Sequence, residues 1–117
     1  MPIQLKRVYE PPGDQDGRRV LVERLWPRGI RKADLAFDEW AKDVAPSAEL
    51  RRWFAHDPAK WEEFERRYRA ELDENPGAWQ ALLEASRQDK LTLLFSSHDT
   101  AHNNAVVLKE YLEEHAR

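Results

Sequence analysis

Two arginines around a proline–glycine turn are the side chains in this sequence best suited to chemistry. Arg24 and Arg28 lie four residues apart in the string R-L-W-P-R-G, which ends at Gly29. A guanidinium presents a fixed fork of donors that matches a phosphate or a carboxylate, and a glycine lets an anion approach the backbone closely. The pattern therefore predicts an anion-binding turn. The alternative is that both arginines pair with acids such as Glu23 or Asp38 and have a structural role.

A second group of polar residues follows the apolar stretch Leu91 to Phe95. The run S-S-H-D-T-A-H-N-N covers residues 96–104 and is expected to lead into a helix. The first N–H groups of a helix have no partner within it, and the helix dipole favours an anion there. If this run meets the arginine turn, the two would form a pocket for a phosphate or a nucleotide. The predicted site comprises Arg24, Arg28, Gly29, Lys42, Ser97, Asp99, His102 and Asn103. The simpler alternative is that Ser97 or Asp99 only caps a helix.

The same polar run contains residue types found in metal sites and hydrolases. A metal site is disfavoured because no H-E-x-x-H is present and His98 is expected to precede the helix. A Ser-His-Asp hydrolase is disfavoured because there is no G-x-S-x-G and residues this close in sequence rarely adopt triad geometry. His56 precedes Asp57 and is interpreted as a cation at a helix C-terminus. We expect neither a metal nor a cofactor, and these residues leave open whether the protein is an enzyme.

Length and composition exclude several classes of protein. The chain has 117 residues, no cysteine, 41% hydrophobic and 35% charged residues, which is typical of one folded domain. The absence of cysteine excludes disulfides, Cys-based zinc sites and thiol catalysis. No apolar run approaches the ~18 residues of a membrane span, and the first residues do not resemble a signal peptide. We therefore expect a cytoplasmic protein without a membrane partner.

The net charge of −3 hides an uneven distribution. Residues 1–33 contain eight Lys and Arg against four acids, whereas the rest of the chain is strongly acidic. This indicates a basic patch, which suggests nucleic-acid binding by residues 18–32 with Trp26 as an alternative function. The overall acidity counts against that alternative. A third hypothesis is a structural or protein-interaction domain, either a monomer or a homodimer.

Two strands are predicted near the start of the chain to position the arginine turn. Ile3 to Tyr9 alternates apolar and polar residues, and Arg18 to Trp26 contains the run V-L-V, both typical of strands. The loop between them is too short for a crossover helix, so we expect the two strands to be antiparallel if they are neighbours. Pro27 ends the second strand because it cannot donate to a ladder. Ile30 to Leu35 is expected to form one helical turn.

The remaining elements are predicted mainly as helices. Phe37 to Val44 fits a helix or a strand, and its short length favours a strand. Helix starts are indicated by Ser47, Asp57-Pro58 and Asn75-Pro76. Five aromatic residues on the helical faces are expected to pack in the core: Trp53, Trp61, Phe64, Tyr68 and Trp79. Leu91 to Phe95 reads as a buried central strand, followed by a last helix capped by Ser96, Ser97 or Asp99.

This order of elements predicts one compact domain over residues 1–117, in the α/β or α+β class. A small mixed β-sheet of about four strands would carry packed α-helices. In open sheets of this kind, ligands bind at loops that leave the carboxyl ends of the strands.

Several strings in the sequence resemble those of a known family. V-L-V-E-R-L-W-P-R-G (residues 20–29), L-T-L-L-F-S-S (91–97) and H-N-N-A-V-V-L (102–108) are similar to the YeaO-like branch of the domain-of-unknown-function 488 family. The resemblance covers essentially the whole chain and implies a compact, bacterial-type cytosolic α/β domain, but no particular activity. The family pattern falls on Arg24, Pro27, Arg28, Gly29, Lys42, Ser47, Asp99 and Asn103.

Three positions depart from that pattern or vary within it. Glu23 stands where the family usually has Asp, the position of His98 is typically basic, and His102 can be replaced by an amide. The resemblance therefore favours anion binding over metal binding or histidine catalysis.

Overall fold

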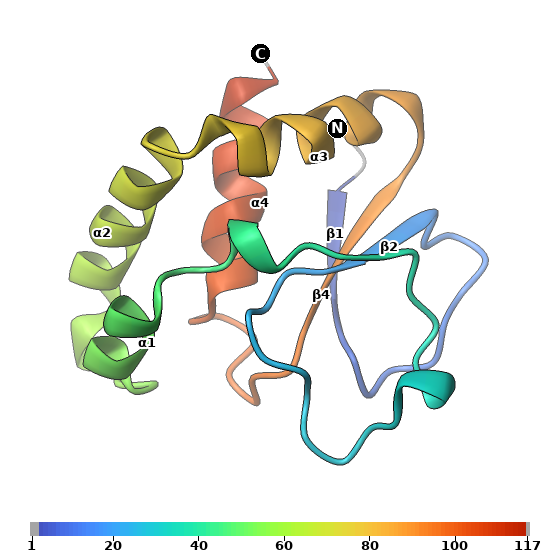
Figure 1. Cartoon of the computed structure of the whole chain (residues 1–117), viewed down its shortest axis with the longest axis horizontal. Helices are drawn as coiled ribbons and strands as arrows, with labels where there is room; N and C mark the ends of the chain where they lie inside the picture. The colour runs from blue at the N-terminus through green and yellow to red at the C-terminus, as the bar shows by residue number, and fades with distance from the viewer. Residues whose placement is uncertain (1–2, 117) are drawn as a thin grey trace.

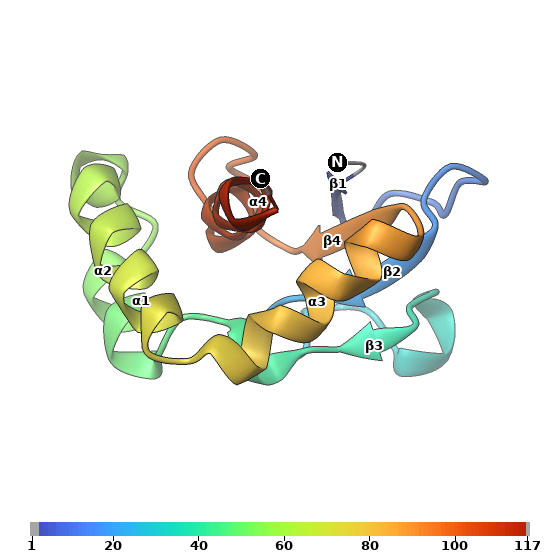
Figure 2. The same ribbon diagram turned by 90° about the horizontal axis from the view of Figure 1, so that it is seen from above.

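The centre of the protein is a four-stranded sheet in which every strand runs in the same direction. A computed structural model describes residues 3–116 and gives the strand order β1-β4-β2-β3 (Figures 1 and 2). The strands are β1 (Ile3–Arg7), β2 (Arg18–Leu21), β3 (Glu39–Trp40) and β4 (Leu91–Phe95). β4 pairs in parallel with both β1 and β2, and β2 pairs in parallel with β3. The predicted α/β class and the four strands are confirmed.

Four α-helices and three short 3-10 helices complete the described part of the chain. The α-helices are α1 (Ala48–Phe54), α2 (Trp61–Asp73), α3 (Pro76–Gln88) and α4 (Asn104–His115). The 3-10 helices are η1 (Lys32–Asp34), η2 (Lys42–Val44) and η3 (Pro58–Lys60). α4 packs against β1 and β4, and α2 and α3 pack against α4 (Figure 2). No helix within residues 3–116 is both long enough and apolar enough to cross a bilayer.

Alternate residues of β4 serve two separate hydrophobic clusters. Leu91, Leu93 and Phe95 belong to the large cluster shared with the helices, whereas Leu94 belongs to a smaller cluster with Leu21. This alternation follows from the period of two along a strand. The smaller cluster is covered by partly buried side chains from the segment between β2 and β3 and from β3 itself: Trp26, Ile30, Phe37 and Trp40. Helices therefore cover one face of the sheet, and irregular chain covers the other.

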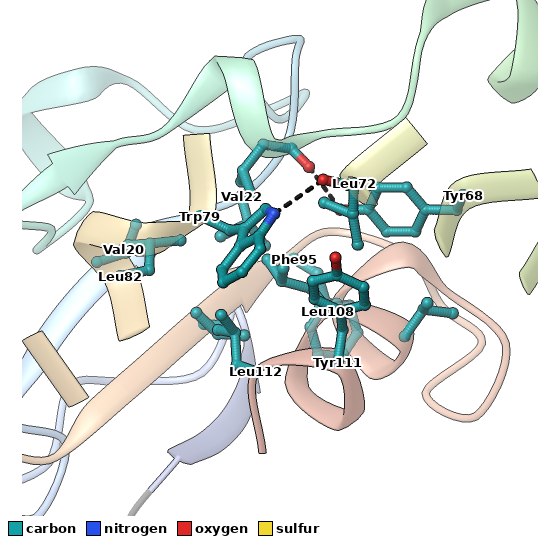
Figure 3. Close-up of a cluster of buried hydrophobic side chains, with 14 of the residues drawn as sticks. Val20, Val22, Tyr68, Leu72, Trp79, Leu82, Phe95, Leu108, Tyr111 and Leu112 are labelled. Carbon is teal, nitrogen blue, oxygen red and sulfur yellow. Dashed lines mark hydrogen bonds between the residues drawn. The ribbon is translucent and has the colours of Figure 1, made fainter. Parts of the chain in front are cut away.

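The aromatic residues predicted to pack in the core do so. Phe64, Tyr68 and Trp79 are buried, and Trp53 and Trp61 pack at the edge of the same cluster. The Trp79 Nε1 donates to the Leu72 carbonyl oxygen at 2.8 Å, which satisfies the indole inside the core (Figure 3). A buried tryptophan stabilises a core when its indole N–H has a hydrogen-bond acceptor, as it has here.

The first two strands are not neighbours, so the condition on which antiparallel pairing was expected is not met, and the prediction of a mixed sheet is wrong. β4 lies between β1 and β2 and is parallel to both, so the sheet over residues 3–116 is wholly parallel rather than mixed. The loop between Arg7 and Arg18 contains no helix, yet it brings the chain back along the length of the strand and across β4. Backbone hydrogen bonds show that β4 lies between β1 and β2. The Val8 N–H donates to the Phe95 oxygen, and the Val22 N–H donates to the Leu94 oxygen.

Residues 37–44 contain parts of both predicted alternatives. Glu39–Trp40 forms the short edge strand β3, and Lys42–Val44 forms the 3-10 helix η2. The helical turn predicted over residues 30–35 is present as η1. Gly29 has a left-handed backbone, with a φ of 78°, which glycine adopts without strain.

The predicted helix starts are largely confirmed, but the last one is displaced. The Ser47 Oγ accepts from the Leu50 N–H at 3.1 Å, and Asp57 Oδ1 accepts from the Ala59 N–H at 3.0 Å. α4 is capped by Asn103, whose Oδ1 accepts from the Val106 N–H. The prediction that Ser96, Ser97 or Asp99 caps this helix is therefore wrong. Asp99 binds the N–H groups of Ala101 and His102 instead, in an irregular loop before α4.

A buried ionic cluster lies on the face of the sheet that the helices do not cover. The Asp16 carboxylate is 5% exposed and binds Lys6 Nζ at 3.0 Å and the Arg19 guanidinium. It also accepts from the Gly13 N–H and from Gln4 Nε2. Burial alone would raise the pKa of Asp16, but these donors outweigh it and lower the pKa from 3.8 to about 2. The carboxylate therefore stabilises the fold in its charged form.

We expect Asp16→Asn to destabilise the protein by about 3 kcal/mol at pH 7, because it leaves Arg19 buried without its counter-charge. Asp14→Asn removes the same charge from an exposed neighbour and should change stability by less than about 0.5 kcal/mol. Urea unfolding of the two variants and the parent measures both values. Equal stability of the two variants would contradict the assigned role of Asp16.

The low pKa of Asp16 predicts how the stability of the fold depends on pH. Because the folded pKa is lower than the unfolded one, this stabilisation is complete above pH 3.8 and is lost as the pH falls through about 2. The difference in pKa corresponds to about 2 kcal/mol. Urea titrations between pH 5 and 2 should show this loss in the parent and a correspondingly smaller slope in Asp16→Asn.

Candidate functional site

A cleft of about 660 Å³ lies at the carboxyl ends of the strands. Its walls are the segment after β2, the residues that lead into α1 together with α1 itself, and the loop after β4. These segments meet in the lower part of Figure 1. All four strands end at this edge because they are parallel, so the chain leaving β1, β2 and β4 reaches the same place. This is the position at which open parallel sheets bind ligands.

Positive charge dominates the lining of the cleft. Arg24 and Arg28 come from the segment after β2, and Arg51 and Arg52 come from α1. Glu23 is the only carboxylate that lines the cleft among the described residues. A concave surface with an excess of one charge attracts ions of the opposite charge. The cleft is therefore electrostatically suited to an anion.

Most of these guanidiniums have unused hydrogen-bonding capacity. Within residues 3–116, the side chains of Arg28 and Arg52 have no hydrogen-bond or ion-pair partner. The Nε of Arg51 is buried and has no acceptor. Arg24 makes only two long contacts, from Nε to the Pro46 oxygen at 3.4 Å and from Nη2 to the Ala45 oxygen at 3.3 Å. A buried donor without an acceptor is unfavourable, so an anion in the cleft would complete bonds that the protein leaves unmade.

The single acid of the cleft is already engaged. The Glu23 carboxylate accepts from the Ser96 Oγ at 2.7 Å and from the Ser96 N–H at 3.1 Å. These contacts join the segment after β2 to the loop after β4. They also occupy the first N–H of that loop, so an external anion would have to bind nearer to the arginines than to Ser96.

Two residues at the carboxyl end of β1 hold the walls of the cleft together. Arg7 donates from Nε to the Ser97 oxygen at 2.9 Å and from Nη2 to the Ser96 oxygen at 3.2 Å. The Tyr9 hydroxyl donates to the Arg28 oxygen at 3.1 Å. Since Arg7 and Tyr9 both extend from β1, this strand holds the other two loops in fixed positions.

Half of the predicted site residues line the cleft. Arg24, Arg28, Ser97 and Asn103 are brought together there. The other four, which are Gly29, Lys42, Asp99 and His102, are not part of the lining.

The four residues outside the lining have local roles. Gly29 provides the left-handed turn after Arg28. The Lys42 Nζ lies over the Trp40 ring, 4.1 Å from its centre. The Asp99 Oδ2 binds the His102 Nδ1 at 2.9 Å. The Ala101 N–H and His102 lower the pKa of Asp99, so this exposed carboxylate is charged near neutral pH.

Sequence reasoning missed the contribution of α1 to the cleft. Arg51, Arg52 and His56 line it, although only the aromatic face of this helix and a helix-end role for His56 had been recognised. A usable signal was present, because the buried face of α1 is marked by Leu50 and Phe54. Arg51 and Arg52 occupy the intervening positions and therefore lie beside that face, not on it.

The chain that leaves α1 has an unfavourable backbone beside the cleft. Ala55 and His56 both have positive φ angles, of 48° and 58°, although neither is glycine. A left-handed conformation costs a residue with a Cβ atom roughly 1–2 kcal/mol. This turn directs the exposed His56 into the lining of the cleft.

Comparison with known proteins places the chain in a family. The family described as "Inactive DUF488-N3 subclade" matches residues 2–117. The chain belongs to this family. The uncharacterised protein YeaO of Escherichia coli strain K12 is 46% identical over 112 residues, covering 96% of this chain and 97% of that relative. An uncharacterised protein of Mycobacterium tuberculosis strain H37Rv is 41% identical over 110 residues, covering 94% of this chain and 92% of that relative. No solved structure matches the chain.

We expect Ala55→Gly to stabilise the protein by about 1 kcal/mol, because glycine adopts the left-handed conformation without strain. Ala70→Gly is the matched control, since Ala70 is exposed within α2, where glycine should destabilise by about 1 kcal/mol. Urea unfolding of both variants measures the difference. A loss of stability in Ala55→Gly similar to that in Ala70→Gly would show that the turn is not strained.

Proposed function

We propose that this protein binds a small phosphate-bearing ligand in the arginine-lined cleft. The observation that carries the proposal is the set of four guanidiniums around one cavity, with a buried Arg51 Nε that has no acceptor. Arginine forks bind phosphate oxygens in pairs, and such charge-assisted hydrogen bonds are among the strong ones. The single competing carboxylate, Glu23, is held by Ser96.

Binding is better supported than catalysis. The family description includes the word "inactive". The cleft also has few groups for proton transfer, since its titratable side chains other than arginine are Tyr9, Glu23 and His56 among the described residues. General acid–base chemistry needs a group free to exchange a proton with the ligand, and Glu23 is committed to Ser96.

Nucleic-acid binding by residues 18–32 is less well supported. Arg18 pairs with Glu39, Arg19 with the buried Asp16, and Arg31 with Asp34. Cations that are already paired contribute less to the neutralisation of a phosphate backbone. This segment therefore has less positive charge available for a nucleic acid than its number of Lys and Arg residues suggests.

We expect Arg28→Gln to weaken the binding of inorganic phosphate about tenfold, because it removes a charge-assisted contact worth roughly 1.5–3 kcal/mol. NMR titration of the labelled protein at constant ionic strength measures the affinity and shows which residues respond. The shifts should concentrate on Arg24, Arg28 and Arg51.

Arg31→Gln is the control for this experiment. It removes the same charge from the same segment, but Arg31 is exposed, pairs with Asp34 and does not line the cleft. It should leave the affinity nearly unchanged. The proposal is wrong if phosphate causes no shifts at the cleft, or if both variants weaken binding equally.

A further inference from the structure

The rim of the arginine-lined cleft is unusual for a surface that would only bind an ion. Among the described residues, Tyr9 and Leu25 are the large hydrophobic side chains that are exposed, at 48% and 64%. Both line this cleft, on segments that follow β1 and β2. Exposed apolar groups gathered at one concave site indicate contact with a ligand that is itself partly apolar.

The size of the cleft also exceeds what one phosphate ion requires. Its volume of about 660 Å³ lies in the middle of the range of roughly 300–1,000 Å³ that is typical of sites for organic ligands. The buried rings of Phe54 and Phe64 lie at the wall of the cleft together with the arginines. A bare anion would leave the exposed surfaces of Tyr9 and Leu25 uncovered.

Tyr9 is held as a rigid platform. Its hydroxyl is fixed to the Arg28 oxygen at 3.1 Å, and the Arg7 guanidinium lies 4.7 Å from the centre of its ring. A ring held at one end and backed by a cation loses little freedom when another flat group stacks on it. Stacking of a nucleic-acid base on an aromatic side chain uses this chemistry.

The charge of the cleft indicates more than one phosphate group. Among the described residues, four arginines line it, and the one carboxylate there is bound to Ser96. Near neutral pH a single phosphate has at most two negative charges and would leave part of this positive charge without compensation. A diphosphate matches the arginines more closely, because its charge is higher and its oxygens extend over a greater length.

We propose that the ligand is an organic diphosphate that carries a flat ring, which is the chemistry of a nucleoside diphosphate. This inference rests on the proposed function and specifies its ligand. The arginines bind the diphosphate, and the ring lies against Tyr9 and Leu25.

The test measures the affinities of inorganic phosphate, pyrophosphate and ADP for the full chain by calorimetry at one ionic strength. We expect pyrophosphate to bind about tenfold more tightly than phosphate, and ADP about tenfold more tightly than pyrophosphate. Tyr9→Leu and Tyr9→Phe both lose the hydroxyl bond to the Arg28 oxygen, so they should change the affinity for pyrophosphate to the same extent. Tyr9→Leu should in addition abolish the advantage of ADP over pyrophosphate. Tyr9→Phe keeps the ring and should retain the advantage.

The outcomes separate this inference from the proposed function. If phosphate and pyrophosphate bind but ADP gains nothing, the flat ring is wrong and anion binding stands. If phosphate and pyrophosphate bind equally, the diphosphate is wrong. If Tyr9→Leu and Tyr9→Phe lose the advantage of ADP to the same extent, the hydroxyl tether rather than the ring is responsible, and stacking is wrong. If none of the three binds at the cleft, both proposals fail.

Discussion

Parallel pairing on both sides of β4 is the constraint on which the rest of the molecule depends. β4 is completely buried, and its two neighbours take their direction from it. Because all strands then end at one edge, the chain leaving each of them meets there. The cleft results from this convergence, and a mixed sheet would have sent some of these segments to the opposite edge.

The convergent segments are held together by bonds between polar groups. Arg7 fixes two carbonyl groups after β4, Glu23 fixes Ser96, and the Tyr9 hydroxyl fixes the Arg28 carbonyl. Each contact joins segments from different strands. The segment that carries Arg24 and Arg28 is therefore already fixed in position, which reduces the entropy that a ligand would have to remove. The buried Asp16 cluster similarly joins β1 and β2 on the face of the sheet away from the helices.

Local features of the fold could be predicted from sequence, and features that depend on distant segments could not. Ser47 and Asp57 cap because their side chains reach N–H groups two or three residues away. β4 was recognised as buried because four of its five residues are apolar, but its position between β1 and β2 depends on contacts across some 90 residues of chain. The Arg24–Arg28 turn could be recognised because its residues are close together in the sequence. The position of Arg51 and Arg52 beside this turn could not, because α1 reaches the cleft only through the tertiary fold. Asn103 replaces Asp99 as the cap of α4 because Asp99 binds within its own loop.

The central position of β4 also determines when the sheet can form. β1 and β2 are synthesised first, yet neither pairs with the other, and Ile3 finds its partner only at Leu91. On the ribosome, β1 must wait unpaired until most of the chain has been made, and β2 can pair only with the two-residue strand β3 before then. Pairings between residues so distant in sequence make folding slow, and unpaired apolar strands are prone to aggregate. For a nascent chain of this protein, the period before β4 emerges is the interval in which protection by a chaperone would matter most.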